Sequence, residues 1–331
     1  MGIFILKIPT KCNYTIEKII NICNIFIMKY KLNLKNIFNI TSLIFTLIAF
    51  ILIYFKLSSE FAKLNFTKLK FDMLYLIISF SFVTIWFSFL SLSYKYILSI
   101  MEEDISLINS MRIIGISTFG RYIPGKIWFT VGRTLLAERL GIPKKKAFAA
   151  VLIETVYLVL TGLLFSIIVF YYINNHSAVF LFLFPGLFLL ICLISPNLLT
   201  KIMNFILIKF KKETLDINFS WINILILNSF YIVMWIGFGL QFFFLLKSVG
   251  ISSNAFYLIS IYPVSWVIGF IVVFLPSGIG IREGVMVILL SNFLTSPQAI
   301  TISILSRIQM TLSELLFLST LINSGELWRK K

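Results

Sequence analysis

Two short segments of this 331-residue chain combine charged residues with glycine and proline inside an otherwise apolar sequence. The first covers residues 120–133 and the second covers residues 275–284. Glycine and proline weaken helices, and backbone groups freed in hydrocarbon find no water to bond. A charge at bilayer depth costs about 2.5–3.5 kcal/mol. Because such segments are tolerated where they line a cavity or a binding site, we expect both to be functional.

The first segment has the composition of a phosphate-sized anion site. Arg121, Lys126 and Arg133 surround a predicted helix break at Pro124 and Gly125. The planar guanidinium of arginine binds phosphate oxygens in pairs, and a helix that starts after a break points free N–H groups at an anion. The alternative is that these residues are ordinary anchors on the positively charged side of a membrane.

The second segment places a charged pair directly after a helix break. Arg282 is expected to join the phosphate site, and Glu283 is expected to belong to an interior polar path; a structural salt bridge between them is the alternative. The break itself is predicted at Pro276, Ser277, Gly278 and Gly280.

Further charges occur inside predicted membrane helices. Glu154 lies about 10 Å along its helix at 1.5 Å per residue. Residues three, four and seven apart share one helix face, so a polar stripe is predicted along Ser303, Arg307, Thr311 and Glu314. We expect charges inside membrane helices to have a function. The alternative is an ion pair that only fixes the register of the helices.

No motif of a hydrolase, an ATPase or a metalloprotease occurs, and the one histidine, His176, lies in a short polar turn. The three cysteines have no metal-ligand spacing, so we expect no metal and no cofactor. The chain is therefore predicted not to be an enzyme. The alternative is a membrane glycosyltransferase that acts on polyprenyl-phosphate sugars, with Glu60 or Asp72 as its acidic residue.

The elements that would position these residues are membrane helices, because 59% of the chain is hydrophobic. We predict an all-α polytopic fold with about seven or eight crossings and two re-entrant, broken-helix units. Residues 275–294 either make a net crossing, which gives eight crossings and a C-terminus inside, or dip in and return, which gives seven crossings and a C-terminus outside. The first is preferred. Crossings are predicted at residues 37–55, 73–100, 147–173, 178–194, 221–246, 255–274 and 300–323.

Basic residues give a net charge of +16 and gather in clusters. Clusters of this kind mark the cytoplasmic side of a multi-pass protein of the plasma membrane, so the N-terminus is predicted inside. They cap membrane helices instead of forming one solvated face, which argues against nucleic acid as a partner. Residues 1–36 are predicted to be a basic interfacial segment, residues 37–323 a single transmembrane domain, and residues 324–331 a basic tail.

The spacing of prolines and charges suggests an internal repeat. Pro124, Arg133, Pro143 and Glu154 follow one another much as Pro276, Arg282, Pro297 and Arg307 do. Two facing copies of a broken-helix unit are how many transporters build a site at the bilayer midplane.

At these residues the chain resembles the transmembrane, flippase-like region of the lysylphosphatidylglycerol synthase family. Residues 119–133, 275–284 and 306–315 are similar to its signatures, and the likeness covers residues 40–323. The helix after the first signature departs from many relatives, since Thr155 and its neighbours stand where they carry arginine and then aspartate. The soluble synthase domain is absent from this sequence, so lysyl transfer by this chain alone is not expected.

The resemblance implies a lipid-translocating protein of cell-envelope biogenesis. We expect membrane lipids with an anionic or glycan-bearing headgroup as its partners. The remaining alternative is an accessory subunit that works with envelope-biosynthesis proteins or as a homo-oligomer.

Overall fold

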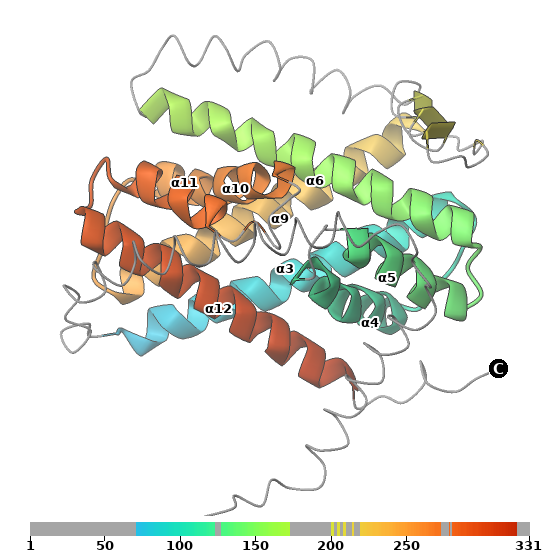
Figure 1. The fold of residues 1–331 in the computed structure, drawn as a ribbon, viewed down its shortest axis with the longest axis horizontal. Coiled ribbons are helices and arrows are strands. Elements are labelled where there is room, and N and C mark those ends of the chain that lie inside the picture. Colours follow the sequence, from blue (N-terminus) through green and yellow to red (C-terminus); the bar gives the residue numbers. More distant parts are fainter. Residues whose placement is uncertain are drawn as a thin grey trace, which may run out of the picture. The chain divides into compact units, whose positions relative to one another are not determined.

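The computed structural model divides the chain into two compact units, Met1–Thr41 and Ser42–Lys331. The residues it describes all belong to the second unit; they are 71–122, 127–172, 219–272 and 280–322, with Gly278 and a few residues between 200 and 214. The predicted terminal segments, 1–36 and 324–331, and the predicted crossings at 37–55 and 178–194 lie outside them. Every regular element in the described part is a helix, as the fold class requires (Figure 1).

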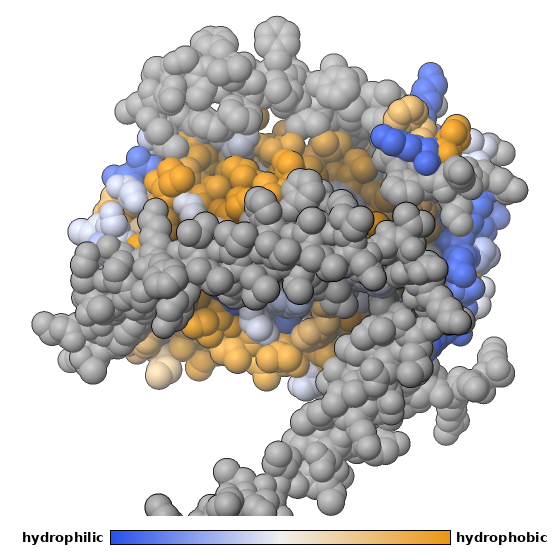
Figure 2. All heavy atoms as spheres, in the orientation of Figure 1, coloured by the Kyte–Doolittle hydropathy of each residue, from blue (hydrophilic) through white to orange (hydrophobic). Residues whose placement is uncertain are grey.

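Four long apolar helices form the frame of the described part: α3 (Met73–Ile100), α6 (Lys144–Tyr172), α9 (Trp221–Ser248) and α12 (Ser296–Ile322). Their 27 to 29 residues reach about 40 Å at 1.5 Å per residue, which exceeds the hydrocarbon thickness of about 30 Å. Within the described residues these are the four helices long and apolar enough to cross a membrane. Apolar side chains form much of the surface that the described residues present in Figure 2. The polytopic membrane fold is therefore confirmed.

Helices α3 and α9 run antiparallel and define the two sides of the molecule. At one end the Asp72 amide donates to the Ser248 carbonyl at 2.7 Å. At the other end the Tyr96 hydroxyl donates to Asn223 Oδ1 at 3.0 Å. We call the end where α3 finishes side A, and the end where α3 begins side B.

The first broken segment forms a re-entrant hairpin that enters from side A. It consists of α4 (Leu107–Thr118), a short 3₁₀ turn η2 (Phe119–Tyr122) and α5 (Ile127–Arg139). The 13 residues of α5 reach only about 20 Å, too short to cross. The Lys146 ammonium donates to the Met101 carbonyl at 2.7 Å, so α6 begins where α3 ended. The chain has returned to side A, and we call α4–η2–α5 hairpin 1.

The second broken segment forms hairpin 2, which enters from side B. Its arms are α10 (Ala255–Ile271) and α11 (Ile281–Leu290). The Tyr257 hydroxyl, near the start of α10, donates to the Leu289 carbonyl, near the end of α11, at 2.8 Å. Both ends of the hairpin therefore lie together on side B.

Hairpin 2 differs from the predicted full crossing at residues 255–274. With 17 residues, α10 reaches about 25 Å, and the chain then turns back through Gly278 at φ 66°. A Cβ at Gly278 would lie 2.7 Å from the Gly269 carbonyl oxygen, so the turn packs closely against α10. Because α11 returns the chain to side B, α12 crosses to side A.

The two halves of the described part have the same order of elements in opposite orientations. The first half is α3, hairpin 1 and α6, and the second is α9, hairpin 2 and α12. Each hairpin packs against the long helix of the other half, hairpin 1 on α12 and hairpin 2 on α6 (Figure 1). The predicted internal repeat is thus an inverted repeat, the arrangement that brings two breaks to one midplane site.

A buried polar network holds three of the long helices together. Gln241 of α9 donates its amide to Gln309 Oε1 of α12 at 2.6 Å, and Gln309 donates to Ser79 Oγ of α3 at 2.7 Å. The Ser79 hydroxyl donates to the Gln241 carbonyl at 2.6 Å, which closes the ring. All three side chains are buried, so this network fixes α3, α9 and α12 as a common support.

Candidate functional site

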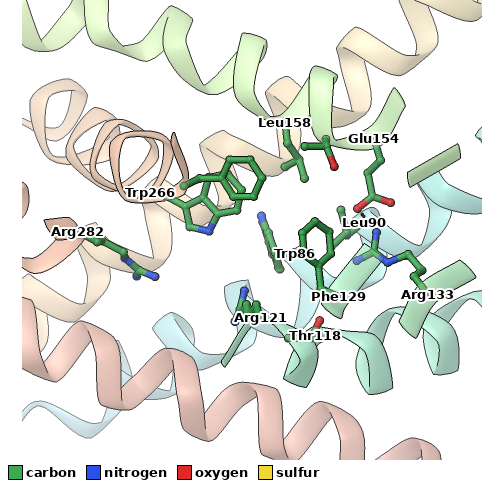
Figure 3. Close-up of a pocket in the computed structure, with 12 residues that line it drawn as sticks. Trp86, Leu90, Thr118, Arg121, Phe129, Arg133, Glu154, Leu158, Trp266 and Arg282 are labelled. Atoms are coloured by element: carbon green, nitrogen blue, oxygen red, sulfur yellow. Dashed lines mark hydrogen bonds and ion pairs between the residues drawn. The ribbon is translucent and has the colours of Figure 1, made fainter. Parts of the chain in front are cut away.

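The tips of the two hairpins meet at a cavity of about 70 Å³. Arg121 reaches it from hairpin 1 and Arg282 from hairpin 2, and Trp86 of α3 lies next to Arg121 in the middle of the view (Figure 3). Arg133 of α5 and Glu154 of α6 line its other end. Residues from both halves of the inverted repeat therefore share one cavity, in which a few charged side chains lie among aromatic and aliphatic ones.

Arg133 and Glu154 form a buried ion pair at one end of the cavity. Their side chains are 4% and 2% exposed, and Arg133 Nη1 contacts Glu154 Oε1. Arg133 Nε also donates to Ser117 Oγ at 3.1 Å, which ties α5 to α4. Its guanidinium carbon lies 5.6 Å from the ring centre of Tyr94, within cation–π range. This pair joins hairpin 1 to α6 and leaves little of the Arg133 charge uncompensated.

Arg121 is held at the tip of hairpin 1 by a residue of the other half. It pairs with Glu314 of α12, whose side chain is 1% exposed. The neighbouring Tyr122 hydroxyl donates to Glu314 Oε2 at 2.8 Å. Glu314 therefore receives both an ion pair and a hydrogen bond from η2, and it anchors hairpin 1 to α12.

Glu283 and Arg307 form the corresponding link in the second half. Glu283 Oε2 accepts a hydrogen bond from the Gly280 amide at 2.6 Å, so it caps the first turn of α11. Its other oxygen lies 3.7 Å from Arg307 Nη1 on α12. The Arg307 guanidinium also lies 5.7 Å from the Tyr122 ring centre. Hairpin 2 is thus attached to α12 close to the point where hairpin 1 is attached.

Arg282 has a different environment from Arg121 and Arg133. Its side chain is buried, and in the part of the chain that the structure describes no carboxylate lies within ion-pair distance of it. Its guanidinium carbon lies 4.3 Å from the Tyr262 ring centre, and Nη2 has no hydrogen-bond partner. A Cβ at Gly269 would lie 3.0 Å from Arg282 Cβ, so α10 holds the base of this side chain closely. The site therefore contains a buried cation that lacks an anion.

The predicted site residues divide into three groups. Arg121, Arg133, Arg282 and Glu154 line the cavity together. Glu283, Arg307, Thr311 and Glu314 lie beside it and hold the hairpins; the Thr311 hydroxyl is 3.5 Å from that of Tyr122. Gly278 and Gly280 form the turn before α11, both with positive φ. The remaining predicted site residues lie outside the described part; they are Lys126, Pro124, Gly125, Pro276 and Ser277.

Sequence reasoning missed the aromatic part of the site. Nothing in the sequence marks Tyr122, Trp86 or Trp266 as site residues. They lie in apolar stretches or in the first broken segment, and aromatic residues at helical spacing usually belong to a hydrophobic core. The structure also gives Asp72 a local role, since its side chain accepts the Leu74 amide at 3.0 Å and caps α3. Among the described residues no cluster of three metal-ligating side chains occurs.

Comparison with known proteins gives one match. A family model described as the lysylphosphatidylglycerol synthase TM region matches residues 37–317. No curated protein and no solved structure matches the chain. The matched residues include both hairpins and the described cavity residues.

Proposed function

Because this chain belongs to the lysylphosphatidylglycerol synthase TM region family, we propose that it carries lipid headgroups across a membrane. In this proposal it moves an anionic phospholipid or a lipid-linked glycan without changing it chemically. The headgroup passes the cavity between the hairpins, and the acyl chains stay in the surrounding lipid. The protein needs no cofactor for this function, and its partners are membrane lipids.

The observation that carries the proposal is the unpaired, buried Arg282. A cation taken out of water costs several kcal/mol unless an anion compensates it. The phosphate of a lipid headgroup is such an anion, and arginine binds its oxygens in a planar fork. The neighbouring arginines are paired with Glu314 and Glu154. Arg282 is therefore the residue that we assign to phosphate binding, with Arg121 beside it.

The inverted arrangement of the hairpins suits a carrier that opens alternately to two sides. Hairpin 1 enters from side A and hairpin 2 enters from side B, and both reach the same cavity. Small movements of either hairpin against the network of α3, α9 and α12 open the cavity to one side at a time. Transporters built from inverted repeats use the same principle around a fixed midplane site.

We further propose that the protein lies in the plasma membrane with side A in the cytoplasm. Side A carries a basic cluster at the end of α5 and the start of α6, namely Arg139, Lys144, Lys145 and Lys146. Basic residues of this kind are retained on the cytoplasmic side. A cytoplasmic N-terminus follows if residues 37–55 cross once before α3. A role in cell-envelope biogenesis remains part of this proposal.

Exchange of fluorescent lipids in reconstituted vesicles tests the function. Vesicles carry acyl-labelled phosphatidylglycerol or a polyprenyl-phosphate lipid, and dithionite measures how much label reaches the outer leaflet. We expect Arg282→Gln to lower the exchange rate at least tenfold, because the phosphate loses its charged partner. The matched control is Arg139→Gln, which changes an exposed arginine at the end of α5 and should stay within twofold of wild type.

Equal exchange by wild type and Arg282→Gln for every lipid tried would show that the proposed function is wrong. Conversion of the lipid to a new product during the assay would favour the enzyme alternative. Exchange that needs a co-purified envelope protein would favour the accessory-subunit alternative.

A further inference from the structure

Glu154 has one carboxylate oxygen that no described group satisfies. Oε1 contacts Arg133, whereas Oε2 is buried and has no hydrogen-bond partner. The side chain is 2% exposed and lines the cavity. A buried acceptor without a donor costs roughly the desolvation of that atom, so a bound molecule with a donor would satisfy it.

Other polar groups that line the cavity are donors that lack an acceptor. Three buried donors have no acceptor among the described residues: Arg282 Nη2, Arg121 Nε and Trp86 Nε1. Figure 3 shows Arg282 on one side of the cavity, Arg121 and Trp86 in the middle, and the Arg133–Glu154 pair on the far side. The cavity therefore has unmatched donors on hairpin 2, hairpin 1 and α3, and an unmatched acceptor on α6. The complementary ligand has an acceptor group and, beyond it, a donor group.

The charges around Glu154 decide which kind of donor fits. Arg133 already compensates the carboxylate, and Arg121 and Arg282 line the same cavity. An ammonium group placed at Oε2 would meet three guanidinium groups and one carboxylate that is already paired. A hydroxyl group donates the same hydrogen bond and brings no charge. The site thus favours a neutral hydroxyl over an amine.

We infer that the headgroup carried by this protein is an anionic phosphate that bears a hydroxyl group, which donates to Glu154 Oε2. The phosphate lies at Arg282, and the hydroxylated part, a glycerol or a sugar, extends toward α6. A cavity of about 70 Å³ has room for roughly five waters, and therefore for the polar atoms of a small polyol. This inference rests on the proposed function and narrows its substrate class to hydroxylated, amine-free headgroups.

Two lipids with the same phosphodiester, one with and one without headgroup hydroxyl groups, test the inference. Phosphatidylglycerol and phosphatidylmethanol carry the same phosphodiester charge, but phosphatidylmethanol has no hydroxyl. Binding of their dioctanoyl forms to the detergent-solubilised full chain is followed by tryptophan fluorescence, since Trp86 and Trp266 line the cavity. We expect phosphatidylglycerol to bind about tenfold more tightly, the effect of one hydrogen bond to a charged group. Phosphatidylethanolamine and lysylphosphatidylglycerol should bind more weakly than phosphatidylglycerol.

The variant Glu154→Gln tests the assigned residue. Its amide oxygen can keep the contact with Arg133, and its NH₂ group replaces the free acceptor. The variant also frees the charge of Arg133 in the cavity, so the affinity for both anionic lipids should change in the same direction. We expect the preference for phosphatidylglycerol over phosphatidylmethanol to disappear. Glu138→Gln, which changes an exposed carboxylate of α5, is the matched control and should retain the preference. The comparison of lipids on the wild-type protein stands even if Glu154→Gln does not fold.

The outcomes separate this inference from the proposed function. Equal binding and equal exchange of phosphatidylglycerol and phosphatidylmethanol would overturn the inference and leave lipid transport intact. Tighter binding of either amine-bearing lipid would overturn it as well. A clear preference for phosphatidylglycerol in binding, without exchange of any lipid in vesicles, would support the site and refute transport.

Discussion

Glu314 shows how a single carboxylate can hold a re-entrant segment in place. It receives Arg121 and the Tyr122 hydroxyl from the tip of hairpin 1, although it belongs to the other half of the molecule. Removing one partner of a buried ion pair leaves an uncompensated charge, which costs about 3–5 kcal/mol. We therefore expect the loss of either partner to weaken the attachment of hairpin 1 to α12.

We predict that Glu314→Gln lowers the thermal stability of the purified protein by about 3 kcal/mol. Arg121→Gln combined with Glu314→Gln should recover part of the loss, because no charge is then left alone. The measurement is thermal unfolding in one detergent, with Glu138→Gln as the control. The exposed pair of Glu138 and Lys144, 3.1 Å apart, is worth at most about 1 kcal/mol. Equal loss in the double and single variants would contradict this role.

For single residues, the sequence predicts which positions belong to the site more accurately than it predicts the role of each position. The charged residues of both broken segments and of α6 and α12 could be found from the sequence, because charge inside a membrane is costly and therefore rare. The partners could not be found, because Arg121 pairs with a residue 193 positions further along the chain. The structure also changes the predicted phosphate-binding set. Arg133 and Arg121 already have carboxylate partners, whereas Arg282 has none among the described residues.

At the scale of elements, the two hairpins use the same device with the charges exchanged. Arg133 on α5 pairs with Glu154 on α6, whereas Glu283 on α11 pairs with Arg307 on α12. In each half the second arm of the hairpin is joined to the long helix that follows it. The breaks could be predicted from proline and glycine, but the return of the chain to side B after α10 could not. The apolar composition of α10 is that of a crossing helix, and its length is only a few residues less than a crossing needs.

The turn of hairpin 2 depends on Gly278, and we predict that Gly278→Ala damages the site. The residue has φ 66°, and an added Cβ would lie 2.7 Å from the Gly269 carbonyl oxygen. Both effects push α11 away from α10 and displace Arg282. We expect lipid exchange to fall at least tenfold, together with a loss of about 2 kcal/mol in stability.

Gly284→Ala is the matched control for this turn. It changes a glycine within α11, and an added Cβ there meets no atom within 4 Å. Alanine favours a helix over glycine by about 1 kcal/mol, so this variant should be neutral or slightly stabilising. If Gly278→Ala behaved like Gly284→Ala in both assays, the close packing of the turn would not be needed.

At the scale of the whole described part, the inverted repeat fixes which loops share a side. The loops on either side of hairpin 1 lie on side A, and those on either side of hairpin 2 lie on side B. The sequence predicts the alternation of long crossings, because hydropathy and basic clusters report it directly. The opposite entry of the two hairpins depends on packing between halves, which no local pattern records.

Labelling of single cysteines tests this topology in cells. In a background without Cys12, Cys23 and Cys192, cysteine is placed at one exposed position before or after each hairpin: Glu102, Lys144, Ser252 and Ser291. A membrane-impermeant maleimide should label the last two in intact cells, and the first two only after permeabilisation. Labelling of Ser252→Cys and Ser291→Cys from opposite sides would show that hairpin 2 crosses the membrane.

The contact between Tyr122 and Glu314 also sets an order for biosynthesis. The two residues are 192 positions apart. At 5–20 residues per second, the ribosome reaches Glu314 about 10–40 s after it has made hairpin 1. During that interval Arg121 has no carboxylate from α12, and its burial in lipid is unfavourable. Hairpin 1 therefore gains the carboxylate that compensates Arg121 only after α12 has been synthesised.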